Sequence, residues 1–244
     1  MTNDEWHALV SKVTDRMNEA VKHSVTPLSK YDHNIPKFVG TGTFLLKDEK
    51  LQIVSAAHVI SDCAESFCPF DKDEFLALEE AGVWPDPNVD VGYFPLRDSK
   101  SLYGVHALHE GVIGSSQSLL AGEVLYFRGC SGENTMGMPG QLSTLPSGYC
   151  VQQKAGTEED ENLQVLWKPK EFRFSEETEE VARNRLKMKN PKGLSGSLLW
   201  DTGFVRAGCD HSTWSPSMAK VVGIIVRWDK DVLIAVPLEK TYLA

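Results

Sequence analysis

The sequence has no long apolar run, no excess of basic residues and few cysteines, and each absence excludes a class of protein. Purely apolar stretches are a few residues long, as in Ile224–Val226, whereas a membrane-spanning helix needs about 20. The first dozen residues include Asp4 and Glu5 and lack the apolar core of a secretory signal. The formal net charge of -9 argues against nucleic acid, because phosphate contacts need a basic face. We therefore expect neither a membrane nor a nucleic-acid partner.

The cysteines indicate a compartment. There are five of them, an odd number without the tight spacing of a disulfide framework: Cys63, Cys68, Cys130, Cys150 and Cys209. This pattern fits reduced thiols, so we expect a cytoplasmic protein. We expect Cys130 and Cys150 to be buried free thiols. A secreted protein processed from a longer precursor is the alternative.

An amphipathic helix is expected over residues 3–24. Its apolar residues recur every three or four positions and form one stripe: Trp6, Leu9, Val10, Val13, Met17, Ala20 and Val21. Two interpretations remain open. The stripe packs on the body of the protein, or it docks a regulatory protein partner.

After Pro27 the sequence becomes a series of short β-branched segments separated by glycine, proline and acidic turns. Strands are expected at Lys37–Lys47, Leu51–Ala56, Val89–Pro95, Glu123–Arg128, Tyr149–Gln153, Leu163–Trp167, Gly196–Trp200, Lys220–Trp228 and Val232–Pro237. Many short strands with few helices favour an all-β sandwich or barrels. Short helices are expected at Asp73–Gly82 and Glu176–Lys187, and a loop at Glu158–Glu161.

Three stretches carry side chains suited to catalysis. Val54–Val59 is a strand that runs through two alanines into His58, whose imidazole suits general base work near neutral pH. Val89–Leu96 places Asp90 in an apolar, strand-like run, where a carboxylate needs a partner such as an imidazole N–H. Gly193–Trp200 places Ser195 between glycines on a tight turn before an apolar strand. Gly193 has no Cβ, so its N–H can lie beside that of Ser195 and form an oxyanion hole.

The order His58, Asp90, Ser195 resembles the trypsin-like (chymotrypsin-fold) serine peptidases, including the bacterial HtrA-like branch. The flanking segments support the resemblance. Phe38–Leu46 looks like the strand before the histidine strand, Gly122–Gly129 like the first strand of the second barrel, and Gly223–Val226 with Ala235–Pro237 like its last two. The resemblance covers about residues 37–240.

The resemblance implies two six-stranded antiparallel barrels with the triad His58, Asp90 and Ser195 between them. We expect an N-terminal helix and linker at 1–36 and a peptidase domain at 37–244, with barrel one at about 37–115 and barrel two at about 116–240. The implied activity is that of a regulated serine endopeptidase acting on protein or peptide substrates without a cofactor.

The sequence also departs from the family. The family follows its serine with two glycines and a proline, whereas this chain has Gly196, Ser197 and Leu198. In digestive members an aspartate before the serine pairs with a freshly cut N-terminus. Leu194 stands at that position here, so the usual activation by cleavage cannot operate.

The preferred substrate side chain is left open. Lys189 and Arg227 near the expected pocket favour an acidic side chain, and Asp229 favours a basic one. A metal site at His58, Cys63 and Cys68 lacks a fourth ligand, so none is expected. The rival functions are a catalytically inactive trypsin-fold binding module and an unrelated all-β adaptor that uses the N-terminal helix.

Overall fold

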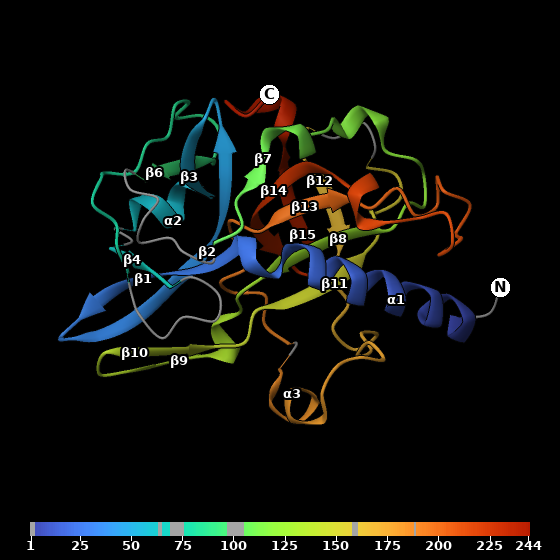
Figure 1. Cartoon of the computed structure of the whole chain (residues 1–244), viewed down its shortest axis with the longest axis horizontal. Coiled ribbons are helices and arrows are strands. Elements are labelled where there is room, and N and C mark those ends of the chain that lie inside the picture. Colours follow the sequence, from blue (N-terminus) through green and yellow to red (C-terminus); the bar gives the residue numbers. More distant parts are fainter. Residues whose placement is uncertain (1–2, 63–64, 69–75, 97–104, 158–160, 188) are drawn as a thin grey trace.

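The computed structural model describes residues 3–62, 65–68, 76–96, 105–157, 161–187 and 189–244 (Figure 1). Two antiparallel sheets make up most of it, side by side, and the helix α1 (Asn3–Val21) lies across the second. None of the helices in this part of the chain combines the length and apolar character needed to cross a membrane. The helical elements that follow α1 are short: α2 (Ala57–Ser61), α3 (Glu180–Arg185) and 3-10 turns at Lys22–Ser24, Glu110–Val112, Ser116–Ser118, Gly132–Asn134, Pro216–Met218 and Leu238–Lys240.

The first sheet has the order β5-β4-β1-β2-β3-β6, and short β7 pairs in parallel with β2. Its strands are β1 (Val25–Asp32), β2 (Ile35–Lys47), β3 (Lys50–Ser55), β4 (Ser66–Phe67), β5 (Leu76–Ala77), β6 (Gly92–Pro95) and β7 (Leu108–His109). β1 corrects the expected boundary. We assigned residues 25–36 to a linker, but they form most of a hairpin with β2 and belong to the first barrel.

The second sheet has the order β11-β8-β13-β14-β15-β12. Its strands are β8 (Leu125–Gly129), β11 (Ser147–Val151), β12 (Leu163–Leu166), β13 (Leu198–Asp201), β14 (Lys220–Asp229) and β15 (Val232–Pro237). Just after β11, Lys154 donates its N–H to the carbonyl of Gln164, and Leu166 donates to Gln152. These bonds join the two ends of the sheet and close the barrel. The fold is mostly β, with two curled antiparallel sheets and one long helix, as the resemblance implied.

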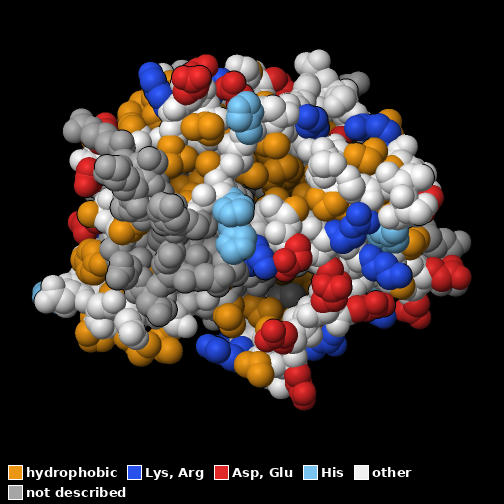
Figure 2. Space-filling model, viewed as in Figure 1, with side chains coloured by type: hydrophobic (Ala, Val, Ile, Leu, Met, Phe, Trp, Pro, Cys, Tyr) orange, Lys and Arg blue, Asp and Glu red, His pale blue; other side chains and the backbone are white. Residues whose placement is uncertain are grey.

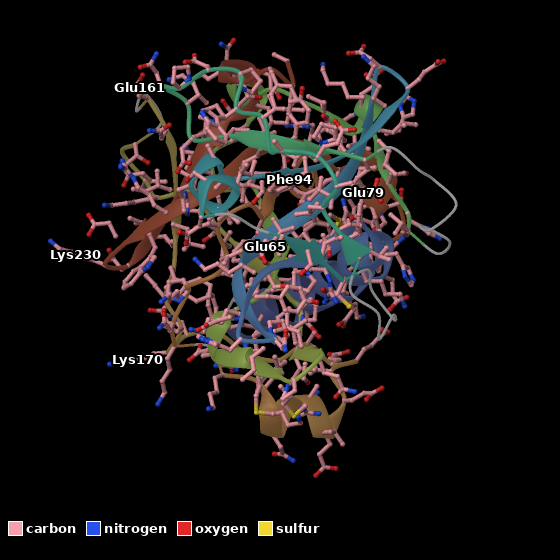
Figure 3. All side chains as sticks on the ribbon, turned by 90° about the vertical axis from the view of Figure 1, so that its left-hand side faces the viewer. Glu65, Glu79, Phe94, Glu161, Lys170 and Lys230 are labelled. Atoms are coloured by element: carbon pink, nitrogen blue, oxygen red, sulfur yellow. The ribbon has the colours of Figure 1, made fainter. Side chains whose placement is uncertain are left out.

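Alternating side chains of β14 and β15 serve two cores, which explains why these strands are apolar on both faces. Val222 and Ile225 point into the second barrel, while Val221 and Ile224 join the core shared with the first barrel. The β14–β15 hairpin ends in a tight turn at Lys230, which projects from the body in Figure 3.

Helix α1 uses its apolar stripe inside the protein. Val13, Met17 and Val21 are buried in the shared core. Asn18 accepts hydrogen bonds from the Tyr126 hydroxyl (2.8 Å) and from Arg128 (2.7 Å), both on β8. Acidic and basic side chains lie side by side over the outer face of this helix in Figure 2. The C-terminal half of the stripe therefore packs on the body of the protein, which is the first of the two interpretations.

Two expected helices differ from the structure. In Glu176–Lys187 only Glu180–Arg185 is helical. The Arg183 side chain donates to the carbonyls of Ser175, Glu176 and Thr178, which holds the preceding residues as a turn. In Asp73–Gly82 the described part contains strand β5 and no helix. Of the expected loop at Glu158–Glu161, only Glu161 lies within the described residues.

Candidate active site

His58 and Asp90 form a doubly bonded pair. The backbone N–H of His58 donates to Asp90 Oδ1 at 2.9 Å, and the ring Nδ1 lies 2.8 Å from Oδ2. Since a carboxylate only accepts hydrogen bonds, the pair places the ring proton on Nδ1 and leaves Nε2 as the free base. The hydrogen bond to Asp90 raises the pKa of His58 above its ordinary value, although partial burial opposes the rise.

The surroundings of Asp90 differ from those expected. Asp90 precedes β6 in a bend, and its side chain is 38% exposed, so it is neither within a strand nor buried. The chain bends there because Val91 donates its N–H to the carbonyl of Val89 at 2.7 Å. Nearby Asp86 instead accepts from the backbone and side chain of Asn88. Asp90 alone of these two carboxylates therefore accepts hydrogen bonds from His58.

The turn that carries Ser195 comes from the second barrel and rests on the first. The Ser195 carbonyl accepts the N–H of Thr41 on β2 at 3.0 Å. Gly196 has a φ of +94°, and a Cβ on it would lie 1.9 Å from the Thr41 carbonyl and 2.3 Å from the Ser55 hydroxyl. Only glycine fits there. Ser55 ends β3, three residues before His58, so this contact brings the serine turn to the histidine.

The Ser195 hydroxyl points at a backbone carbonyl. Its Oγ donates to the carbonyl of Val226 on β14 at 3.0 Å. Within the described residues no hydrogen bond joins Ser195 to His58. The structure thus brings the segments of the predicted triad together and forms the His58–Asp90 pair, while the serine side chain bonds to Val226.

The turn before Ser195 has a defined orientation. The Lys192 carbonyl accepts the N–H of Gly132 at 2.8 Å. In a planar trans peptide the next N–H points the opposite way, so the Gly193 N–H faces away from that bond. Neither the Gly193 nor the Ser195 N–H donates to a described residue. Gly193 has a φ of +98° and packs on Phe38, whose ring atom would lie 2.2 Å from an added Cβ.

Leu194 anchors the same turn. Its side chain is 1% exposed and belongs to the core of the second barrel. The Thr41 hydroxyl donates to the carbonyl of Gly193 at 2.9 Å and accepts the N–H of Cys130 at 3.0 Å. Packing and hydrogen bonds order this turn where a carboxylate is absent.

The predicted pocket residues lie in different settings. Lys189 is exposed, and its backbone N–H donates to Glu133. Arg227 is exposed and directly follows Val226. Asp229 pairs with Val232 at the end of the β14–β15 hairpin. Of the three, Arg227 is nearest in the chain to the carbonyl that binds Ser195.

Sequence reasoning missed the roles of Thr41, Gly132, Glu133 and Val226. Each makes a hydrogen bond to a segment far away in the chain in which at least one partner is a backbone group. Of the metal alternative, Cys63 lies outside the described residues. Cys68 bonds through its backbone to the Thr26 hydroxyl.

Of the two cysteines expected to be buried free thiols, Cys130 is buried and Cys150 is half-buried. Cys130 is fully buried, and burial raises its pKa to about 12. Burial does the same to Cys150, which accepts a hydrogen bond from Thr14. The cysteines that the structure describes are free thiols.

No model of a known protein family matches this sequence. No curated protein matches it either. Similar solved structures include the serine protease domain of the Sesbania mosaic virus polyprotein, with 12% identity over 89% of each chain and a TM-score of 0.47. The HtrA-type protease AlgW with a decapeptide has 11% identity and a TM-score of 0.49. The match covers 93% of this chain and 64% of AlgW.

A third similar structure comes from work on the coupled folding and binding of the intrinsically disordered Sesbania mosaic virus VPg protein, with 12% identity and a TM-score of 0.49. The match covers 91% of this chain and 90% of that one. At these TM-scores the likenesses carry no argument about this chain. Its fold stands on its own two curled antiparallel sheets, which have the two-barrel arrangement that the resemblance implied.

Proposed function

We propose that the protein is a serine endopeptidase with Ser195 as nucleophile, His58 as general base and Asp90 as the residue that orients it. The observation that carries the proposal is the His58–Asp90 pair, in which Asp90 binds both the imidazole and the backbone N–H of His58, on a segment in contact with the turn of Ser195. The free Nε2 of that imidazole is the base such a nucleophile requires.

In the proposed reaction, Ser195 Oγ first leaves the Val226 carbonyl by rotation about one side-chain torsion, a step between staggered rotamers. It then attacks the carbonyl carbon of the scissile peptide while His58 Nε2 takes its proton. The N–H groups of Gly193 and Ser195 stabilise the resulting oxyanion.

His58 next gives the proton to the leaving amine, and the C–N bond breaks to leave an acyl-enzyme on Ser195. Water attacks the ester with His58 again as base, and the second product leaves with Ser195 restored. Asp90 stays ionised throughout and stabilises the imidazolium. The chemistry requires no cofactor.

The proposal extends to the substrate pocket. When Ser195 turns toward His58, the Val226 carbonyl is released to accept an N–H from an extended protein or peptide substrate. In this proposal Arg227, the next residue of β14, lies beside the bound chain. Asp229 lies farther along the same strand, and Lys189 lies on the segment that leads to Ser195. We further expect the enzyme to act in the cytoplasm, where its free thiols stay reduced.

The alternative is a trypsin-fold binding module without activity. One observation favours it: the Ser195 hydroxyl bonds Val226 and not His58. In the peptidase this is a resting rotamer that substrate reverses. In a binding module it is the permanent state.

A fluorophosphonate probe separates the two, because it reacts with a serine only when a base activates it. We expect the purified chain to be labelled at one residue, identified as Ser195 by peptide mass analysis. The Ser195→Ala variant should remain folded and unlabelled, since one oxygen on a turn leaves little cavity. Absence of labelling in the folded wild-type protein would leave the binding module as the better assignment.

A further inference from the structure

We propose that Glu133 is a positioning residue that holds the oxyanion turn in its working orientation, with Asn134 as its companion. This inference rests on the proposed peptidase function and names the device that keeps the site preformed.

The carboxylate of Glu133 binds the segment that leads to the nucleophile. Its Oε1 accepts the backbone N–H of Lys189 at 2.7 Å and that of Asn190 at 2.9 Å. Both bonds are charge-assisted, and such bonds are about twice as strong as those between neutral groups. One side chain therefore fixes two consecutive peptide groups, three to four residues before Gly193.

Neighbouring residues extend the contact in both directions. The Asn134 side chain accepts the N–H of Lys187 at 2.7 Å and donates to its carbonyl at 2.8 Å. The Ser131 hydroxyl donates to the carbonyl of Asn190 at 3.2 Å. With the bond from Gly132 to Lys192, each of residues 131–134 is hydrogen-bonded to a described residue of the segment before Gly193. We call this set of contacts the 133 clamp.

The 133 clamp matters because of the peptide between Lys192 and Gly193. If this peptide turned over, the Lys192 carbonyl would face the oxyanion and repel it. Glycine at 193 lowers the barrier to that change, since it adopts both signs of φ. The bond from Gly132 to the Lys192 carbonyl opposes it, and Glu133 holds the rest of the segment at the distance where that bond forms.

A carboxylate beside the nucleophile could set this orientation, but Leu194 occupies that position here and is buried among apolar side chains. The carboxylate of the 133 clamp acts from the other end of the segment and through backbone N–H groups. It requires neither cleavage of the chain nor a new terminus.

The test uses the labelling kinetics of the fluorophosphonate probe on the full chain, which need no known substrate. For Glu133→Ala we expect the limiting rate of labelling to fall about 10- to 100-fold, at or below the 10²- to 10³-fold cost of losing an oxyanion donor. The probe concentration at half-maximal rate should change less than about twofold, because the pocket is intact. Glu133→Gln should recover most of the rate, since its amide oxygen accepts from the same N–H groups.

A matched control is Asp210→Ala. Asp210 also accepts a backbone N–H on a surface turn, that of Ser212 at 2.8 Å, but it lies in the loop beside α1. Its loss should leave the labelling rate unchanged. The melting temperature of each variant shows whether it is folded at the assay temperature, so that labelling rates are compared only between folded proteins.

Three outcomes overturn the inference. If the wild type is labelled and Glu133→Ala is labelled equally fast, the 133 clamp does not position the turn and the peptidase assignment stands. If Glu133→Ala loses rate only in proportion to unfolded protein, the role is structural. If the folded wild type is not labelled at all, the proposed function fails and this inference fails with it.

Discussion

Replacing Gly193 by alanine tests the geometry of the oxyanion turn directly. The residue has a φ of +98°, and an added Cβ would lie 2.2 Å from Cε1 and 2.9 Å from Cζ of Phe38. A left-handed backbone costs an L-residue about 1–2 kcal/mol. Displacing the Phe38 ring from its rotamer costs about 0.5–1.5 kcal/mol more.

Together these costs amount to about 1.5–3.5 kcal/mol, and the turn avoids them if it leaves its working orientation. At 1.36 kcal/mol per factor of ten, we expect the limiting rate of fluorophosphonate labelling to fall about 13- to 370-fold. Phe38→Ala in the same background removes the clash and leaves the backbone strain. It should therefore recover about 2- to 13-fold of the loss.

Gly208→Ala is the matched control, because Gly208 has a φ of +77° but open space around its Cβ position. It should lower the melting temperature slightly and leave the labelling rate unchanged. A Gly193→Ala variant that is labelled at the wild-type rate, with or without Phe38, would refute this account of the turn.

Three further predictions concern the pair and the turn. Asp90→Asn should lower kcat by about 10⁴-fold, as for an orienting aspartate in such a triad. Asp86→Asn should have little effect, because the carboxylate of Asp86 accepts its hydrogen bonds from Asn88 and not from His58. Equal small losses in peptide hydrolysis would mean that another acid serves His58. Labelling requires neutral His58, so the labelling rate should fall as the pH drops through the pKa of His58. The midpoint should lie above the ordinary 6.5, because Asp90 raises this pKa, and it should move down in Asp90→Asn. A midpoint that does not move would contradict the effect of Asp90 on His58. The intact chain should react with the probe without cleavage, because Leu194 offers no carboxylate to a new N-terminus. It should also react in the presence of EDTA and a reducing agent, because the proposed chemistry uses neither a metal nor a disulfide. Reactivity seen only after trimming near residues 25–37, or only with added zinc or calcium, would refute this prediction.

The sequence predicted the architecture well where apolar periodicity was strong. Strands β14 and β15 alternate between two cores and were found nearly at their expected bounds. β1 was missed because Pro27 and Ser29 interrupt its apolar pattern, although its pairing with β2 spans the whole strand. Local propensity carried little information there, because the strand is defined by its partner.

The candidate site was predicted in part for a similar reason. A histidine, an aspartate and a serine between glycines can be recognised in the sequence itself. The structure forms the hydrogen-bonded pair of His58 and Asp90. The prediction that Asp90 is buried was wrong, because its side chain is 38% exposed. Two hydrogen bonds from His58 hold this half-exposed carboxylate in place. Glu133 carried no signal, because its effect depends on backbone N–H groups more than fifty residues away.

Thr41 has a mechanical consequence. It belongs to the first barrel, yet its hydroxyl and N–H bind Gly193, Ser195 and Cys130 of the second. A hinge motion that parted the barrels by a single ångström would break these bonds first, while both sheets kept their own hydrogen bonds. The labelling rate of Ser195 would then report whether the two barrels are in contact. In a urea titration it would vanish at a lower concentration than the one at which the strands melt, and the gap between the two midpoints would measure how loosely the halves are joined.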